Sequence, residues 1–123
     1  MHHFKELFQF ADWKQEKHVP VIEVPEVIKK EEKIEIKVSV GKEIPHPNTM
    51  EHHIAWIDVF FLPEGEKFPY HLGRFEFLSH GALTYSDPEI SFAFKTEKSG
   101  ELFAFSFCNL HGLWAGSKKL NVK

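Results

Sequence analysis

The stretch IEIKVSV at residues 34–40 alternates apolar and polar side chains without a break. Successive side chains of an extended chain point to opposite faces, so this period of two predicts a strand with one buried face. The same period recurs in ISFAF at residues 90–94 and in FAFSF at residues 103–107. Residues 54–62 are apolar almost throughout, apart from Asp58, which predicts a central strand.

Further strands are predicted at residues 19–24, 70–77 and 118–122, whereas only residues 5–13 carry the pattern of a short N-terminal helix. About seven short strands with almost no helix predict an all-β fold. We expect residues 1–123 to form a single domain, an antiparallel immunoglobulin-like β-sandwich, with a closed barrel as the alternative.

Two details of packing follow from the same patterns. Lys98-Ser99-Gly100 predicts a hairpin turn between the runs at 90–94 and 103–107. The thirteen phenylalanines are expected to fill the sandwich core, because the Phe runs lack the adjacent basic residues of a base-stacking surface.

The composition excludes several classes of function. A chain of 123 residues is the size of one domain, and its net charge of −3 argues against a nucleic-acid partner and against a polybasic membrane anchor. No window approaches the ~18 consecutive apolar residues of a membrane span. The first residues show no apolar signal region, so the expected compartment is the cytoplasm.

The single cysteine, Cys108, excludes a disulfide within the chain and any four-cysteine metal site. It ends the third alternating run, and His111 follows in a loop that closes at Gly112. This Cys-x-x-His spacing allows a thiolate and an imidazole to bind one metal. The alternative is a buried free cysteine, which is a common fate of this residue.

Two further segments carry histidines beside predicted strands. Prolines on both sides of His46 restrict the backbone there, which suits a fixed ligand. His52 and His53 open the next strand, and adjacent strand residues point to opposite faces, so the strand cannot aim both at one site. For any one of these histidines, a polar loop residue is the simpler interpretation.

The third segment is Glu16-Lys17-His18. In extended chain Glu16 and His18 share a face, which suits a metal or a proton-transfer site, although a solvated patch is the alternative. Taken together, one thiolate and at least four imidazoles are too soft a set for calcium or magnesium. They also exceed the four ligands of structural zinc, whereas iron accepts five or six.

Three blocks of this sequence, taken in order, resemble superoxide reductase. They are EKHVP at residues 16–20, HPNTMEHH at 46–53 and CNLHG at 108–112, and together they span most of the chain. The similarity is greatest to the one-iron class, also called neelaredoxin. The two-iron relatives, the desulfoferrodoxins, carry an additional N-terminal four-cysteine centre, which this chain cannot form.

The resemblance implies reduction of superoxide to hydrogen peroxide, by one electron and two protons, without release of dioxygen. It implies one iron ion per chain, cycling between Fe²⁺ and Fe³⁺, with the following site residues: imidazole ligands His18, His46, His52 and His111, an axial thiolate from Cys108, Glu16 as the carboxylate at the sixth position of the oxidised resting state, and Lys17 as the residue that attracts the anion. It further implies rubredoxin or a similar small electron donor as partner, and a homotetramer.

Backbone N–H groups of residues 109–111 are candidate donors to the Cys108 sulfur. The best rival function is a blue-copper-like electron carrier on a β-sandwich, which also uses His and Cys ligands. Such a carrier commonly has an axial methionine after its last histidine, and neither Met1 nor Met50 follows His111. A non-catalytic immunoglobulin-like binding module is the second rival.

Overall fold

A computed structural model describes all residues of the chain, 1–123. One 3-10 turn and ten strands follow one another along it: η1 Phe4–Leu7, β1 Pro20–Glu23, β2 Val27–Ile28, β3 Ile34–Val40, β4 Ile54–Pro63, β5 Tyr70–Glu76, β6 His80–Gly81, β7 Thr84–Tyr85, β8 Glu89–Phe94, β9 Gly100–Cys108 and β10 Gly112–Val122. The all-β prediction is confirmed, and seven of these strands have four or more residues. The predicted N-terminal helix is reduced to the single turn η1. No helix is long and apolar enough to cross a membrane.

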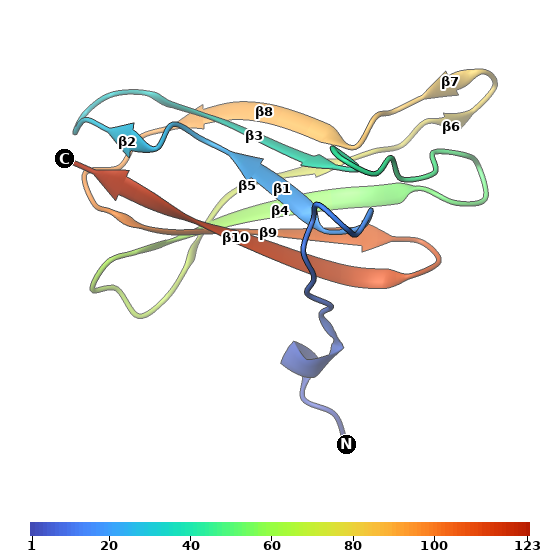
Figure 1. Cartoon of the computed structure of the whole chain (residues 1–123), viewed down its shortest axis with the longest axis horizontal. Helices are drawn as coiled ribbons and strands as arrows, with labels where there is room; N and C mark the ends of the chain where they lie inside the picture. The colour runs from blue at the N-terminus through green and yellow to red at the C-terminus, as the bar shows by residue number, and fades with distance from the viewer.

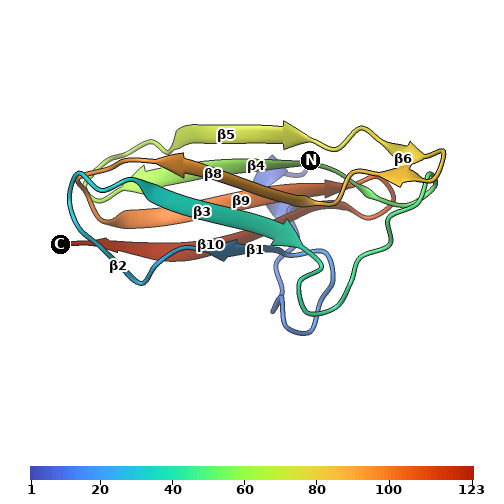
Figure 2. The same cartoon turned by 90° about the horizontal axis from the view of Figure 1, so that it is seen from above.

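The strands form two layers (Figures 1 and 2). One sheet has the order β1-β3-β8 and the other the order β2-β10-β9-β4-β5, while β6 and β7 form a separate small hairpin. All pairings are antiparallel except that between β10 and β2. In Figure 1 the N-terminal segment extends away from the two layers, below β10.

The core lies between the two sheets. From β3 it receives the alternating residues predicted above, with Ile34, Ile36 and Val38 at most 1% exposed. From β4 it receives Ile57 and Val59, both fully buried. The period of two therefore places Glu35 and Lys37 outside, as expected, whereas Ser39 is buried.

The prediction that Phe103, Phe105 and Phe107 fill the core is wrong. The core face of β9 carries the residues between them, and Leu102 and Ala104 are fully buried. Both faces of β9 are largely apolar, so alternation shows that the faces differ without showing which faces inward. The phenylalanines lie half-buried on the outer face of the five-stranded sheet. There Phe107 stacks on Trp56 of β4 with ring centroids 5.6 Å apart.

The predicted hairpin at Lys98-Ser99-Gly100 is also wrong. β8 pairs with β3 in one sheet, whereas β9 pairs with β4 and β10 in the other. The segment between β8 and β9 therefore crosses from layer to layer over the edge of the core. Turn residues mark a change of direction, and they do not distinguish a hairpin from such an arch.

Candidate metal centre

The strand register brings the three predicted segments to one end of the sandwich. Antiparallel pairing places Pro20, at the start of β1, opposite Val40, at the end of β3. It also places Cys108, at the end of β9, opposite both Ile54 of β4 and Gly112 of β10. Residues that flank these positions must therefore lie close together, although they are distant in sequence.

Two glycines allow the close approach of these segments. Gly112 has a φ of +84°, a value that favours glycine, and it ends the three-residue loop between β9 and β10. A Cβ atom at Gly116 would lie 2.5 Å from the carbonyl oxygen of Pro20. Glycine at this position therefore lets β10 pack against the chain that follows His18.

Four of the predicted ligands form one cluster. His18, His46, His52 and Cys108 each offer a donor atom, and these atoms all lie within 4.8 Å of one another. His111 joins the cluster from the β9–β10 loop, because its Nδ1 lies 3.2 Å from His18 Nε2 and 3.8 Å from Cys108 Sγ. His18 and His46 are buried, and Cys108 is fully buried.

The four imidazoles form a closed square, in which each imidazole lies next to two others. Centroid distances between neighbours are 4.7 Å for His18–His46 and for His46–His52, and 5.0 Å for His52–His111 and for His18–His111. The diagonal from His18 to His52 is longer, at 6.5 Å. Neighbouring rings are nearly perpendicular, with interplanar angles of 70–80°. Four imidazole rings placed in a square, together with a thiolate, are an arrangement unlike the tetrahedral sites of zinc.

Two ring nitrogens lack the partner that burial normally demands. Nε2 of His46 and Nε2 of His52 are buried and make no hydrogen bond with the protein. Buried polar atoms are nearly always paired, so two unpaired lone pairs beside a buried thiol indicate a missing ligand. Imidazole nitrogen and thiolate are good ligands for a transition metal, and the residues present fit a single iron centre.

Hydrogen bonds fix which nitrogen of His46 and His18 carries the proton. His46 Nδ1–H donates to the carbonyl oxygen of Pro47 over 2.7 Å, and His18 Nδ1–H donates to Glu16 Oε1 over 2.7 Å. An acceptor at Nδ1 leaves the lone pair on Nε2, which is the atom aimed at the cluster. Both rings are therefore held in the tautomer that a metal requires.

The electrostatic environment keeps these rings neutral. Burial lowers the pKa of His46 to about 4, and the charges of His18, His52 and Lys17 act in the same direction. Burial also lowers the pKa of His52. It lowers the pKa of His18 as well, although the hydrogen bond from the His18 ring to Glu16 acts in the opposite direction. A metal ion therefore meets little competition from protons at this site.

Glu16 and Lys17 lie half-buried beside the cluster. Glu16 Oε1 accepts hydrogen bonds from both the backbone N–H of His18, at 2.5 Å, and its ring. Burial opposes ionisation of Glu16, but these hydrogen bonds and the charges of His18 and Lys17 outweigh it, so the pKa of Glu16 lies below its ordinary value. In this structure Glu16 thus supports His18 and is not itself part of the donor cluster.

Sequence reasoning missed the side chains that support the ligands. Ser106, fully buried on the core face of β9, donates its hydroxyl to the carbonyl oxygen of His18 over 3.1 Å. Trp114 stacks on the His18 ring, with centroids 4.6 Å apart and planes 10° apart, and its Nε1–H donates to the His111 carbonyl. Correct assignment of the inward face of β9 would have identified Ser106.

Of the backbone N–H groups of residues 109–111, which were candidate donors to the Cys108 sulfur, that of Asn109 is bonded elsewhere. The backbone N–H of Asn109 donates to the carbonyl oxygen of His53 over 3.2 Å. The side chain of Asn109 bonds the same segment, accepting from His53 N–H at 2.8 Å and donating to the Glu51 carbonyl at 2.9 Å. This residue therefore connects the Cys108 loop to the segment that carries His52.

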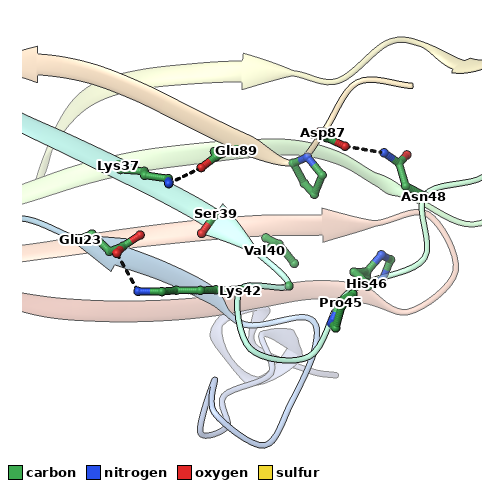
Figure 3. Close-up of a pocket in the computed structure, with 12 residues that line it drawn as sticks. Glu23, Lys37, Ser39, Val40, Lys42, Pro45, His46, Asn48, Asp87 and Glu89 are labelled. Atoms are coloured by element: carbon green, nitrogen blue, oxygen red, sulfur yellow. Dashed lines mark hydrogen bonds and ion pairs between the residues drawn. The ribbon is translucent and has the colours of Figure 1, made fainter. Parts of the chain in front are cut away.

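A polar hollow of about 340 Å³ lies beside His46, opposite the core (Figure 3). Lys42 donates to Glu23 over 2.7 Å, and Lys37 lies 2.5 Å from Glu89 in the same lining. Asn48 hydrogen-bonds Asp87 over 3.4 Å. Both lysines of the lining are thus paired with a carboxylate, so the hollow presents no free cationic side chain.

The geometry disfavours both rival functions. A blue-copper site uses two imidazoles, one thiolate and a weak axial ligand, so it would leave two of the four clustered imidazoles without a role. Met50, the only internal methionine, has an exposed fraction of 66%. A non-catalytic module gives no reason for two unpaired buried nitrogens beside a buried thiol.

Comparison with known proteins agrees with this geometry. The family model described as Desulfoferrodoxin matches residues 10–117. A putative superoxide reductase of Archaeoglobus fulgidus is 60% identical, over 96% of this chain and 99% of its own length. Neelaredoxin of Megalodesulfovibrio gigas is 47% identical, over 96% of this chain and 97% of its own length. The crystal structure of a putative superoxide reductase from Thermotoga maritima superimposes with a TM-score of 0.97 at 47% identity, covering 100% of this chain and 99% of that one.

Proposed function

We infer that this chain, which belongs to the desulfoferrodoxin family, is a superoxide reductase of the one-iron class. It reduces superoxide to hydrogen peroxide by one electron, with uptake of two protons and without release of dioxygen. The observation that carries the proposal is the square of four imidazoles beside Cys108, in which two buried Nε2 atoms lack partners. On this proposal residues 1–123 form one iron-binding domain.

We propose His18, His46, His52, His111 and Cys108 as the protein ligands of a single iron ion. When bound, ferrous iron supplies the electron that superoxide requires. The five donors are one fewer than the six that octahedral iron accepts, and catalytic metal sites keep such a position for the substrate. The imidazoles are neutral, so the thiolate of Cys108 is the only ligand among the five that brings a negative charge.

Lys17 is proposed to attract the substrate. Superoxide is a small anion, and a positive charge at the entrance of a site raises the rate of encounter. The charge of Lys17 acts on the pKa values of His18, His46 and His52, which supports its position close to the proposed ligands. Because the chain carries a net charge of −3, any such attraction must be local.

Glu16 is proposed as the carboxylate that takes the sixth position after the reaction and displaces the product. In this structure its Oε1 is held by the backbone N–H and the ring of His18. On this proposal the carboxylate moves from His18 to the sixth position.

Rubredoxin or a similar small redox protein is proposed as the electron donor. Leu110, next to His111 in the β9–β10 loop, has an exposed fraction of 60%. A donor that binds over this loop would approach a proposed ligand without crossing the core. The cytoplasmic location stays a prediction.

We also propose a homotetramer, supported by the outer face of the five-stranded sheet. This face carries a shallow apolar hollow whose lining residues are Phe4, Phe8, Trp56, Asp58, Phe60, Phe105, Phe107 and Leu113. Apolar patches of this kind on a protein surface mark interaction sites. Burial of this face against another copy of the chain would remove it from water.

The function is tested by anaerobic reconstitution with iron followed by a pulse of superoxide, with both peroxide and dioxygen measured. We expect about one iron per chain and one peroxide per superoxide consumed, without dioxygen. Release of one dioxygen for every two superoxide molecules would instead show dismutation. Retention of copper in preference to iron would favour the electron carrier.

A further inference from the structure

The ring of the proposed ligand His52 is held differently from the rings of His18 and His46. The rings of His18 and His46 are each fixed by a hydrogen bond from Nδ1, to Glu16 and to the Pro47 carbonyl. Metal-binding imidazoles are nearly always oriented in this way through their second nitrogen. The His52 ring makes no such bond at Nδ1, and its buried Nε2 has no partner either.

The backbone on both sides of His52 is held instead. The side-chain amide of Asn109 spans it, because Nδ2–H donates to the carbonyl of Glu51 at 2.9 Å and Oδ1 accepts from the N–H of His53 at 2.8 Å. The N–H of Asn109 adds a third hydrogen bond, to the His53 carbonyl at 3.2 Å. These three bonds form a clip around His52, here called the Asn109 clip.

The Asn109 clip joins two elements that both carry proposed ligands. Asn109 directly follows Cys108, so the clip fixes the chain around His52 relative to the sulfur. A side-chain amide carries its donor and its acceptor on two separate atoms, so it can bond the Glu51 carbonyl and the His53 N–H at once, whereas an aspartate would present a carboxylate oxygen to the Glu51 carbonyl. Asparagine therefore suits a position that must bond both the Glu51 carbonyl and the His53 N–H.

His53, the second histidine of the block at residues 46–53, has no place in the ligand set, and it completes the support. Its ring stacks on His80, with centroids 3.5 Å apart and planes 6° apart, and its Nδ1–H donates to the Thr49 carbonyl over 2.9 Å. His53, which donates one hydrogen bond to Asn109 and accepts another from it, is therefore itself fixed against the β6–β7 hairpin.

We propose that Asn109 is a positioning residue for His52, and that its clip substitutes for the missing hydrogen bond at the His52 ring. This inference rests on the metal centre proposed above. It predicts that the loss of the Asn109 side chain weakens metal binding through His52 alone. A double-mutant cycle isolates such a coupling.

The experiment titrates the metal-free full-length chain with Co²⁺ under argon. The dissociation constant and the thiolate-to-cobalt charge-transfer band are both measured. Loss of an outer partner of a ligand typically weakens metal binding about 10- to 100-fold, so we expect Asn109→Ala to raise the dissociation constant about tenfold or more. In a His52→Ala background, Asn109→Ala should change the constant by less than about twofold, whereas in a His46→Ala background the full loss should remain.

Two further variants control for general damage to the loop. Asn48→Ala removes an amide from the segment between β3 and β4, which also carries His52. The Asn48 side chain bonds the Ser86 carbonyl and His80 and does not span His52. Any effect of Asn48→Ala should therefore persist in the His52→Ala background. Asn109→Asp keeps the size of the side chain and the acceptor for His53 N–H, and we expect an intermediate loss. If Asn109→Ala fails to fold, the cycle is run with Asn109→Asp.

Equal loss in both ligand backgrounds would overturn the proposal, because Asn109 would then act on the fold or on Cys108. Unchanged affinity of Asn109→Ala and Asn109→Asp in the otherwise unaltered chain would overturn it as well. Failure of the unaltered chain to bind Co²⁺ would remove the proposed metal centre and the role of Asn109 with it. Failure of the metal centre is thus distinguishable from failure of the clip alone.

Discussion

The buried imidazole of His46 predicts that the metal-free protein loses stability as the pH falls from about 6.5 to about 4. Burial lowers the pKa of His46 from 6.5 to about 4 in the folded chain, whereas the unfolded chain keeps the ordinary value. A group with a depressed pKa in the folded state binds fewer protons there than in the unfolded state. Its contribution is therefore complete above pH 6.5 and is withdrawn as the pH falls through the folded pKa.

The magnitude follows from the two pKa values of His46. Their difference, 6.5 minus about 4, is about 2.5 pH units. At about 1.4 kcal/mol per unit, the free energy of unfolding should fall by up to about 3.5 kcal/mol from this residue. The lowered pKa values of His18 and His52 act in the same direction. Glu16 contributes only at lower pH, because its pKa lies below 4.5 in the folded chain.

The measurement is urea unfolding of the chelator-treated protein at several pH values between 7.5 and 4.5, followed by tryptophan fluorescence. His46→Gln should flatten the dependence of unfolding free energy on pH, whatever its effect on stability at pH 7.5. His2→Gln is the matched control, because the His2 side chain is 78% exposed. An equal pH dependence in His46→Gln and the unaltered chain would refute the reasoning.

Three further substitutions test the remaining assignments. Lys17→Ala should slow the capture of superoxide about tenfold and flatten its dependence on ionic strength in pulse experiments, and an unchanged salt slope would count against Lys17. Glu16→Ala should leave the rate constant for superoxide reduction largely intact. It should weaken Co²⁺ binding about tenfold, because the His18 ring loses its hydrogen-bond partner. A large loss of rate would remove Glu16 from its assigned role. Phe105→Glu should dissociate the proposed tetramer in light-scattering measurements, and an intact tetramer would place the interface elsewhere.

Much of the fold could be predicted from local patterns. The alternation at residues 34–40 identifies both a strand and its inward face, because its outward positions are charged or hydroxyl-bearing. The same reasoning fails on β9, where Phe105 and Ala104 are both apolar and pattern alone cannot choose between them. The two faces of β9 differ only in the size of their apolar side chains. Packing against the second sheet determines which of them is buried.

The ligand set could be anticipated because its chemistry is carried by residue type. A thiolate at Cys108 and clustered imidazoles restrict the metals that suit them, whatever the fold. The hydrogen bonds that orient them could not be anticipated in the same way. The Asn109 clip depends on β9 pairing with β4, which places Cys108 opposite Ile54, and no local pattern records that pairing.

The core and the site place conflicting requirements on the end of β9. The core favours buried groups that are apolar or paired, whereas the site keeps buried ligand atoms unpaired. Cys108 and Ser106 are fully buried on β9, so the end of this strand belongs to the core as well as to the site. In the metal-free chain, the unpartnered Nε2 atoms of His46 and His52 lie beside that core, and an unpaired buried polar atom costs about 1–3 kcal/mol. Binding of a metal pairs both nitrogens, so its free energy also stabilises the fold. Metal removal should therefore lower the melting temperature, which thermal unfolding of the chain with and without bound metal would measure.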